Sequence, residues 1–318
     1  MSSPTPAPAP TIAILCYPGA QVAAVRGLVD LFVTASHLHA ERGAAGRIET
    51  IELEVGEAGP PRTRPLTAIV LPPSLGHGVP DAPSPRLTRW LVARHGEGTT
   101  LCSVCVGAFV LAETGLLAGR PATTHWALRE VFAGRFPAVA LDTDRILVDD
   151  GDIVTAGGVM AWVDLGLRLI ERHLGPSTML ATARYFLVDP GGREQRFYSS
   201  FAPPLTHGDA AVLRVQHWLQ SRCADKLTLP QMAAKAGLGG RTFLRRFSAA
   251  TGLRPTEYVQ HLRVGKAREL LELTKLTIDE ITWKVGYEDP GAFRKLFLRL
   301  IGLTPGEYRR RFAVAAQR

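Results

Sequence analysis

The chain has 318 residues, of which 46% are hydrophobic, and a formal net charge of +8. This composition can form two ordinary domain cores, and no apolar run approaches the roughly 18 residues of a membrane span, which argues against a membrane-embedded protein. The charge is uneven: residues 213–318 hold 20 Lys and Arg against 9 Asp and Glu, a net of +11, and residues 1–212 hold 17 against 20, a net of −3.

The amino-terminal end and the cysteines indicate the compartment. Residues 1–10 are MSSPTPAPAP, without a positive charge, which is typical of a disordered tail and not of a signal peptide. Four cysteines are too few for a disulfide scaffold, and no second pair completes a zinc set with Cys102 and Cys105. We therefore expect a cytoplasmic protein without a metal or another cofactor.

Residues 11–188 alternate between β-rich runs and helix-like segments. Strands are predicted at 11–15, 48–53, 68–71, 99–104 and 153–155. Helices are predicted at 20–42, 85–95, 107–118, 126–132 and 160–174. Strands separated by helices form a parallel sheet covered on both faces. The expected fold is a three-layer, flavodoxin-like α/β domain, in which ligand sites lie at the carboxyl ends of the strands.

One of these strand ends is suited to a reactive side chain. The predicted strand passes into the next helix without room for a loop, so Cys105 lies at the apex of an abrupt turn. A helix amino terminus lowers the pKa of a thiol, and His125 precedes another helix from which it can reach Cys105. The alternatives are that the turn only requires a small residue and that His125 caps its helix. Asp164 is either a surface acid or an anchor for a neighbouring loop.

Residues 189–208 are dense in turn formers and are predicted to be the linker between two domains. An amphipathic helix over about 209–223 then opens the second domain, residues 209–318.

Within the second domain the same helix-turn-helix pattern occurs twice. The segment AAKAGLGGRTFLRRFSAATGLRPTEYV is matched by ITWKVGYEDPGAFRKLFLRLIGLTPGEYR, which predicts two copies of one supersecondary unit. In both copies phenylalanines at i and i+4 form a buried stripe on the second helix, at Phe243, Phe247, Phe293 and Phe297.

The outer face of each second helix carries cations. A helix-turn-helix presents this helix to the major groove, where cations bind phosphates or the acceptor edge of guanine. For any one cation a solvated face is the alternative, but the basic excess of the chain belongs entirely to this segment. The sequence therefore predicts double-stranded DNA as the partner.

These paired motifs resemble the AraC/XylS family of transcription regulators over about the last hundred residues. The resemblance implies two motifs joined by a long helix, here about 255–273, that enter successive major grooves. By matched position it implies a base-contacting set of Arg241, Leu244 and Arg245 in the first copy, and of Pro290, Gly291 and Lys295 in the second. Further candidates for DNA contacts on these helices are Thr242, Arg246 and Arg294. Gly239 and Gly240 stand where the family usually has a Ser or Thr cap, so this helix is expected to start less stably.

The first domain resembles the class I glutamine amidotransferase-like (ThiJ/PfpI) superfamily. The segments CVGAFVLAETGLLAGRPATTHW, TAGGVMAWVDLGLRLIERHLG and YPGAQ carry the resemblance, which covers most of residues 11–175. It implies that Cys105 is the elbow cysteine and His125 its partner. Val106 and Trp126 are the neighbouring candidates for ligand contacts.

Two departures from that superfamily remove catalytic parts. Ala24 stands where a carboxylate usually holds the cysteine. Pro72 and Pro73 replace an oxyanion turn, and proline has no N–H to donate. We therefore expect Cys105 and His125 to be vestigial and the domain to bind a ligand without catalysis.

Together these features predict a one-component transcription regulator, more an activator than a repressor, whose first domain senses a small metabolite and forms a dimer. The architecture implies a nitrogenous effector, and RNA polymerase is a further candidate partner. Two alternatives stay open. One is a cysteine-dependent hydrolase or amidase using Cys105, and the other is a thiol redox sensor using Cys102 and Cys105.

Overall fold

The structure is a computed structural model that describes residues 9–55, 64–76 and 82–314. Most of the tail expected at 1–10 lies outside these residues. The chain divides into two compact units, Met1–Gln195 and Arg196–Arg318, and the division falls within the segment 189–208 expected to be the linker. The two units are described separately.

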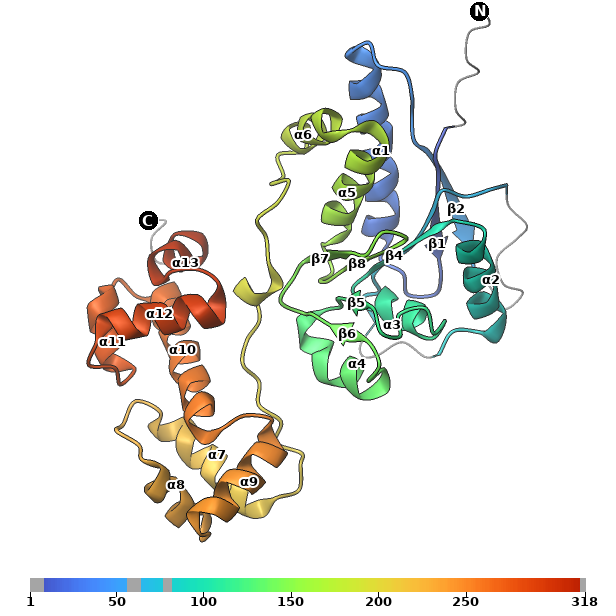
Figure 1. The fold of residues 1–318 in the computed structure, drawn as a ribbon. Coiled ribbons are helices and arrows are strands. Elements are labelled where there is room, and N and C mark those ends of the chain that lie inside the picture. Colours follow the sequence, from blue (N-terminus) through green and yellow to red (C-terminus); the bar gives the residue numbers. More distant parts are fainter. Residues whose placement is uncertain (1–8, 56–63, 77–81, 315–318) are drawn as a thin grey trace, which may run out of the picture. The chain divides into compact units, whose positions relative to one another are not determined.

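The first unit is built on a six-stranded sheet with the order β2-β1-β3-β4-β8-β7 (Figure 1). The strands are β1 (Thr11–Cys16), β2 (Glu49–Glu54), β3 (Ala68–Leu71), β4 (Thr100–Val104), β7 (Leu147–Asp149) and β8 (Ile153–Ala156). Neighbouring strands are parallel except β7, which pairs antiparallel with β8. The inner strands β1, β3 and β4 are almost entirely buried, as expected for a sheet covered on both faces.

Helices cover this sheet on two sides (Figure 1). On one side, α1 (Val22–Glu41), α5 (Trp162–Leu174) and α6 (Pro176–Tyr185) pack against one another. On the other side lies α2 (Pro85–Gly96), and the short α3 (Gly107–Ala112) contacts β3 and β4. The α/β fold expected from the sequence is confirmed, with all five predicted strands present.

The structure differs from the predicted elements in five places. The helix predicted over 107–118 ends at Ala112, because Gly115 and Gly119 adopt φ values of +77° and +74° that end a right-handed helix. The helix predicted over 126–132 is a 3₁₀ turn, Trp126–Leu128, followed by α4 (Arg129–Arg135). Helix α6 and strand β7 were not predicted. Nor was the pair β5 (Pro121–Ala122) and β6 (Ala140–Leu141), because two residues carry no periodicity.

All regular elements described in the second unit are helices (Figure 1). They are α7 (Ala210–Arg222), α8 (Leu229–Ala236), α9 (Gly240–Thr251), α10 (Pro255–Leu273), α11 (Ile278–Lys284), α12 (Pro290–Ile301) and α13 (Pro305–Phe312). The joining helix α10 has the bounds predicted for it. Nowhere in the described part of the chain is a helix both long and apolar enough to cross a membrane.

Two separate cores hold the two helix-turn-helix repeats. The first core joins α7, α8 and α9 to the first half of α10, and the second joins the rest of α10 to α11, α12 and α13. Matching aromatic pairs lie in each. The Phe247 and Tyr258 rings are 5.3 Å apart in the first, and those of Phe297 and Tyr308 are 5.6 Å apart in the second. The predicted duplication is therefore confirmed at the level of packing.

Candidate DNA interface and elbow site

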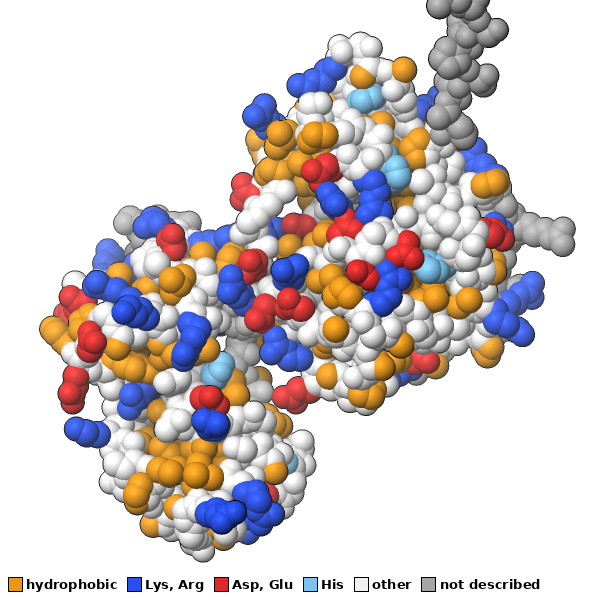
Figure 2. Space-filling model, viewed as in Figure 1, with side chains coloured by type: hydrophobic (Ala, Val, Ile, Leu, Met, Phe, Trp, Pro, Cys, Tyr) orange, Lys and Arg blue, Asp and Glu red, His pale blue; other side chains and the backbone are white. Residues whose placement is uncertain are grey.

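The second helix of the first repeat, α9, exposes four of the residues predicted to contact DNA. Arg241, Thr242, Leu244 and Arg245 are solvent-exposed, whereas Phe243 between them is fully buried. Among the described residues, neither Arg241 nor Arg245 has an ion-pair partner. Lys and Arg side chains gather at the end of the helical unit that contains α9 (Figure 2). This face can accept phosphates or a base edge without first breaking an internal contact.

Arg246 differs from its neighbours because it is bound inside the module. Its Nε and Nη2 donate to the carboxylate of Asp209 at 2.8 and 2.7 Å. Asp209 also caps α7 by accepting the N–H groups of Ala211 and Val212 at 3.1 Å each. The hydrogen bond from Arg246 is the main reason that the pKa of Asp209 is lowered to about 2. This bidentate pair fastens α9 to α7, so Arg246 is less available to DNA than the sequence implies.

In the second repeat, α12 presents a different set of groups. Pro290 occupies the first turn, and the N–H of Gly291 is bound by the capping carboxylate of Asp289 at 2.7 Å. Lys295 is exposed. Arg294 pairs with Asp279 at 2.9 Å, but both side chains are more than half exposed, at 54% and 51%. Such a surface pair contributes little and can give way to a phosphate.

The second helices of the two repeats, α9 and α12, also start differently. Asp289 caps α12, whereas Gly239 precedes α9 and no side chain caps this helix. The missing side-chain cap expected at Gly239 and Gly240 is therefore confirmed, and the weaker helix start stays a prediction. The first helices of both repeats have complete capping boxes, made by Thr228 with Gln231 and by Thr277 with Glu280.

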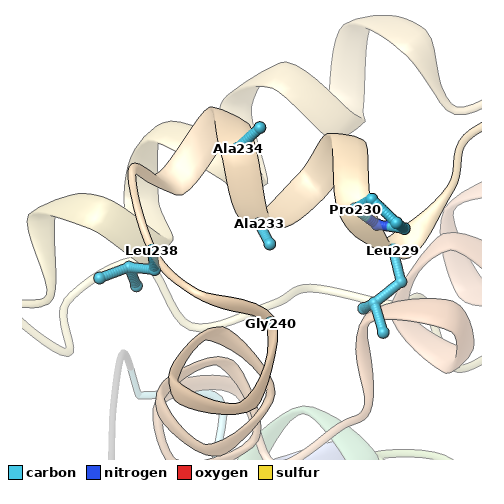
Figure 3. A pocket seen from close by; sticks show the side chains of 6 residues that line it. All are labelled: Leu229, Pro230, Ala233, Ala234, Leu238 and Gly240. Carbon is cyan, nitrogen blue, oxygen red and sulfur yellow. The ribbon is translucent and has the colours of Figure 1, made fainter.

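A hollow of about 370 Å³ lies between α8 and the start of α9 (Figure 3). It is lined by Leu229, Pro230, Ala233, Ala234, Leu238 and Gly240. In the second repeat, the position that matches Ala234 holds Trp283, which is 61% exposed. The lining is apolar throughout and carries no charged group to hold an anion, so we assign the hollow no ligand.

The abrupt turn predicted after β4 is present in the first unit. Cys105 has a φ of +55°, in the left-handed region that is unusual for a residue other than glycine. Its N–H donates to the carbonyl of Ala156 at 2.7 Å, and its carbonyl accepts the hydroxyl of Thr124 at 2.8 Å. Gly107 follows closely, and a Cβ there would clash with the carbonyl oxygen of Leu71. Packing therefore holds Cys105 in a strained elbow.

The expected activation of the Cys105 thiol is wrong. Burial raises its pKa to about 11, and the N–H groups of Val106 and Gly158, which favour the thiolate, only partly offset this. The side chain is 3% exposed, and α3 has only six residues. Desolvation therefore outweighs the helix terminus. Near pH 7 the thiol is therefore almost entirely neutral.

His125 is not placed as a partner of Cys105. Its Nδ1 accepts the N–H of Ala127 at 3.2 Å, so it caps the 3₁₀ turn, as the alternative interpretation held. Burial lowers the pKa of His125 and favours the neutral ring. No hydrogen bond joins His125 to Cys105 within the described residues. The neighbouring Trp126 donates its backbone N–H to Gln195 at 3.0 Å.

Two loops near Cys105 are held through their own carbonyl oxygens. The Tyr17 hydroxyl donates to the carbonyl of Pro72, and the N–H of Gln21 donates to the carbonyl of Pro73 at 2.7 Å. Burial, followed by the nearby Cys105 thiol, raises the pKa of Tyr17 above its usual range. Ala24 is fully buried and supplies no carboxylate. The turn at Pro72 and Pro73 therefore brings no N–H donors for an oxyanion, and Ala24 cannot hold a nucleophile.

Cys102 lies in β4 and is fully buried. Burial raises its pKa to about 12, with smaller effects from Arg172 and Asp149. Both Cys102 and Cys105 are free thiols. Neither is a ready thiolate for redox chemistry.

Comparison with known proteins identifies both units. A family model described as a helix-turn-helix domain matches residues 232–311, and the DJ-1/PfpI family matches residues 67–172. The HTH-type transcriptional regulator ArgR of Pseudomonas aeruginosa is 30% identical over 238 residues, covering 72% of this chain and 70% of the relative. The chain belongs to this family of HTH-type transcriptional regulators.

Two other regulators of this family show similar matches. CdhR of Pseudomonas aeruginosa is 28% identical, over 72% of this chain and 68% of the relative. GlxA of Rhizobium meliloti is 31% identical, over 67% of this chain and 66% of the relative. The matches thus span about two thirds of the length of these relatives. DNA binding in transcription regulation is accordingly the function class of this HTH-type regulator, and the resemblances stated from its motifs are confirmed.

One residue of the elbow region in this HTH-type regulator was not predicted from the sequence. Gln195 lies in the expected linker, yet it is 2% exposed and its amide contacts the loops beside Cys105. A single glutamine among turn formers carries no pattern that could have shown this. Asp164 does anchor a loop, because Arg193 of the expected linker pairs with it.

Proposed function

We propose that the α/β domain of this regulator is a non-catalytic sensor that binds a small metabolite at the elbow site and thereby alters DNA binding. One observation carries the proposal. Cys105 keeps the strained turn of an elbow, at φ +55°, while burial holds the pKa of its thiol at about 11. Backbone strain of this kind costs about 1–3 kcal/mol and persists where the surroundings impose it. The side chain is positioned at the strand ends but is not activated.

The neighbouring groups support a site without catalysis. His125 is engaged with Ala127, Ala24 brings no carboxylate, and the loop at Pro72 and Pro73 presents its carbonyls to Tyr17 and Gln21. A hydrolase at Cys105 would need a base for the thiol and donors for the oxyanion. The site therefore fits binding better than acyl transfer.

The remaining parts of the proposal follow the family architecture. The sensor comprises residues 11–188 and the DNA-binding domain residues 209–318, joined by 189–208. The protein acts as a dimer and as an activator in contact with RNA polymerase, and its effector is a nitrogenous metabolite.

A metabolite screen with the full chain tests the sensor. Thermal unfolding is followed with amino acids, betaines and related compounds, for the wild type and for Cys105→Ala. The expected result is a compound that raises the unfolding midpoint of both proteins and changes DNA affinity in both. Turnover of that compound by the wild type, lost in Cys105→Ala, would instead establish the hydrolase alternative.

The DNA interface is tested by titrating the full chain with duplex fragments at several salt concentrations. The logarithm of the affinity should fall with a log-log slope of about −0.9 for each phosphate contact. Arg245→Ala should cost about 1–3 kcal/mol at one base position if Arg245 contacts guanine. Arg222→Ala is the matched control, because Arg222 lies on α7 and its side chain is 61% exposed. An equal loss for both variants would contradict the assignment of α9 as the reading helix.

A further inference from the structure

Gln195, the last residue of the first unit, lies buried among the loops that surround the elbow. Its Oε1 accepts the N–H of Trp126 at 3.0 Å. Its Nε2 faces three acceptors: the hydroxyl of Thr123 at 3.0 Å and the carbonyl oxygens of Thr124 and Arg145 at 2.8 and 2.9 Å. A side-chain amide has two N–H hydrogens, so both donors are used, and its carbonyl oxygen also accepts a hydrogen bond. Gln195 is therefore fixed in the first unit.

The groups that Gln195 contacts also hold Cys105. The hydroxyl of Thr124 donates to the carbonyl of Cys105 at 2.8 Å. On the other side the amide packs on Gly157, where an added Cβ would collide with it. The next residue, Gly158, directs its N–H to the Cys105 thiol. Any change that moves the two loops around Cys105 must also move or break the contacts of Gln195.

The chain is anchored again immediately after Gln195, now in the second unit. Phe197 is 5% exposed and lies 5.4 Å below the guanidinium of Arg311. The ring of Tyr198 meets Phe312 edge to face at 5.4 Å. Only Arg196 separates the residue fixed in the sensor from the first residue packed in the DNA-binding unit. A single residue therefore forms the whole connection between these two packed side chains.

We propose that Gln195 is the positioning residue that couples the elbow site to the DNA-binding unit. A ligand that displaces the Thr124 loop or Gly157 shifts Gln195. Because only one residue connects Gln195 to Phe197, this shift is passed on to Phe197 and its packing on α13. Gln195 itself needs no contact with ligand or DNA. The inference rests on the proposed sensor function, because it assumes that the elbow is the ligand site.

Hydrogen exchange of the full chain, followed by mass spectrometry, tests the coupling without an effector. Gln195→Glu keeps the shape and the acceptor but removes the donor that faces three acceptors. Repulsion between the new carboxylate and these three acceptors should displace the side chain and break its bond with the Trp126 N–H as well. Exchange should therefore accelerate at least about fivefold at Trp126 and in residues 196–207 near pH 7.5. Burial beside acceptors raises the pKa of the new carboxyl, so lowering the pH to about 5 should restore a donor and reduce the ratio to wild type. A purely steric role predicts no such rescue, and unchanged exchange overturns the proposal.

Arg193→Gln is the matched control. Arg193 fastens the same segment to Asp164 on α5, and none of its hydrogen bonds reaches either loop beside Cys105 in the described residues. The pair is largely buried, with the Arg193 and Asp164 side chains 28% and 11% exposed, so this variant should accelerate exchange around residues 189–194. At Trp126 and in 196–207 its exchange ratio should stay below about twofold, because among the described residues no hydrogen bond joins the pair to either region. Equal acceleration in both variants would show that Gln195 only holds the segment in place, as Arg193 does, and does not couple the two units. If Gln195→Glu does not fold, Gly157→Ala replaces it, because the added Cβ would displace the Gln195 amide. The same acceleration is expected, without the rescue at about pH 5, and unchanged exchange overturns the proposal.

A double-mutant cycle decides whether the signal passes through Gln195. Thr124→Val removes the hydroxyl that binds Cys105 but keeps the carbonyl that binds Gln195. In the wild-type background it should accelerate exchange in 196–207 about threefold, and in the Gln195→Glu background it should add nothing. No effect in the first background, or the same effect in both, overturns the coupling. The metabolite screen is independent of this result, so failure of the coupling and failure of the sensor function are distinguishable.

Discussion

At Cys105 the backbone geometry and the electrostatics lead to opposite expectations. The left-handed φ of +55° is the geometry that presents a nucleophile at the end of a strand. Yet the thiol is buried and its pKa is raised to about 11, so the group presented is a neutral thiol. Position in the fold and reactivity are therefore separate properties. Only the first could be deduced from the missing loop between strand and helix.

The reactivity of Cys105 should follow its raised pKa. With iodoacetamide near pH 7.5, Cys105 should react at least about a hundredfold more slowly than free cysteine, because the thiolate is the nucleophile. The rate should rise continuously toward pH 11. The pKa of this thiol is higher in the folded protein than in the unfolded chain, where it is about 8.5. Its contribution to folding stability is therefore fully present below about pH 8.5 and is lost as the pH rises toward 11. Site-resolved mass spectrometry gives the pH profile, and a plateau below pH 8 would contradict the assignment.

Asp209 should stabilise the second unit through its cap on α7 and its pair with Arg246. Asp209→Ala should lower the free energy of unfolding by about 1 kcal/mol from the lost cap alone. Because the folded pKa is lowered to about 2, the contribution is present above about pH 4 and is lost as the pH falls from 4 to 2. Urea unfolding at pH 7 and pH 3 measures both effects. Asp225→Ala is the control, since the Asp225 side chain lies at the surface in an exposed pair with Arg222.

At the scale of single elements, the uncapped start of α9 is a stability defect that one substitution should repair. Gly239 has φ −64° and ψ 149°, which any residue can adopt, and no atom lies within 4 Å of an added Cβ. Gly239→Ser should raise the free energy of unfolding by about 0.5–1 kcal/mol, through a cap and a less flexible unfolded chain. Thermal unfolding of the full chain measures this gain.

Gly237 provides the opposite control for this prediction. It is equally open to solvent, but it ends α8 with φ +70°. Gly237→Ser should therefore lower stability by about 1 kcal/mol through backbone strain alone. A loss at both positions would mean that Gly239 also needs the freedom of glycine, for example to approach a partner.

The elements that were predictable have long or repeated patterns. The buried strands β1, β3 and β4 are apolar runs, and α10 is bounded by Pro255 and by the end of its apolar periodicity. Strand β7 and the pair β5 and β6 are too short to show a period. The role of His125 was open because a cap and a catalytic partner occupy the same position before a helix. Gln195 acts through tertiary contacts about 50–72 residues away, which local patterns do not encode.

At the scale of the whole molecule, the charge and the fold divide the chain in the same way. The unit with the basic excess contains both repeats, and the unit with the elbow is slightly acidic. The segment between them is not a free linker along its whole length. Phe201 stacks on His261 at 4.7 Å and meets Tyr258 at 5.2 Å, and the carbonyl of Ser199 accepts a hydrogen bond from Arg268. Residues 196–208 are therefore part of the helical unit's packing.

This packing predicts where the DNA-binding unit can be cut. A fragment of residues 196–318 should unfold cooperatively, whereas a fragment of residues 209–318 should be less stable by about 2 kcal/mol or more, the burial free energy of one aromatic side chain. The residues of α9 and α12 that we propose to contact DNA lie in both fragments, so the salt dependence of DNA binding should be the same for the folded forms. Urea unfolding and DNA titration measure the two properties. Phe201→Ala in the longer fragment should reproduce most of the loss, and equal stability of the two fragments would place the boundary of the unit at 209 instead of 196.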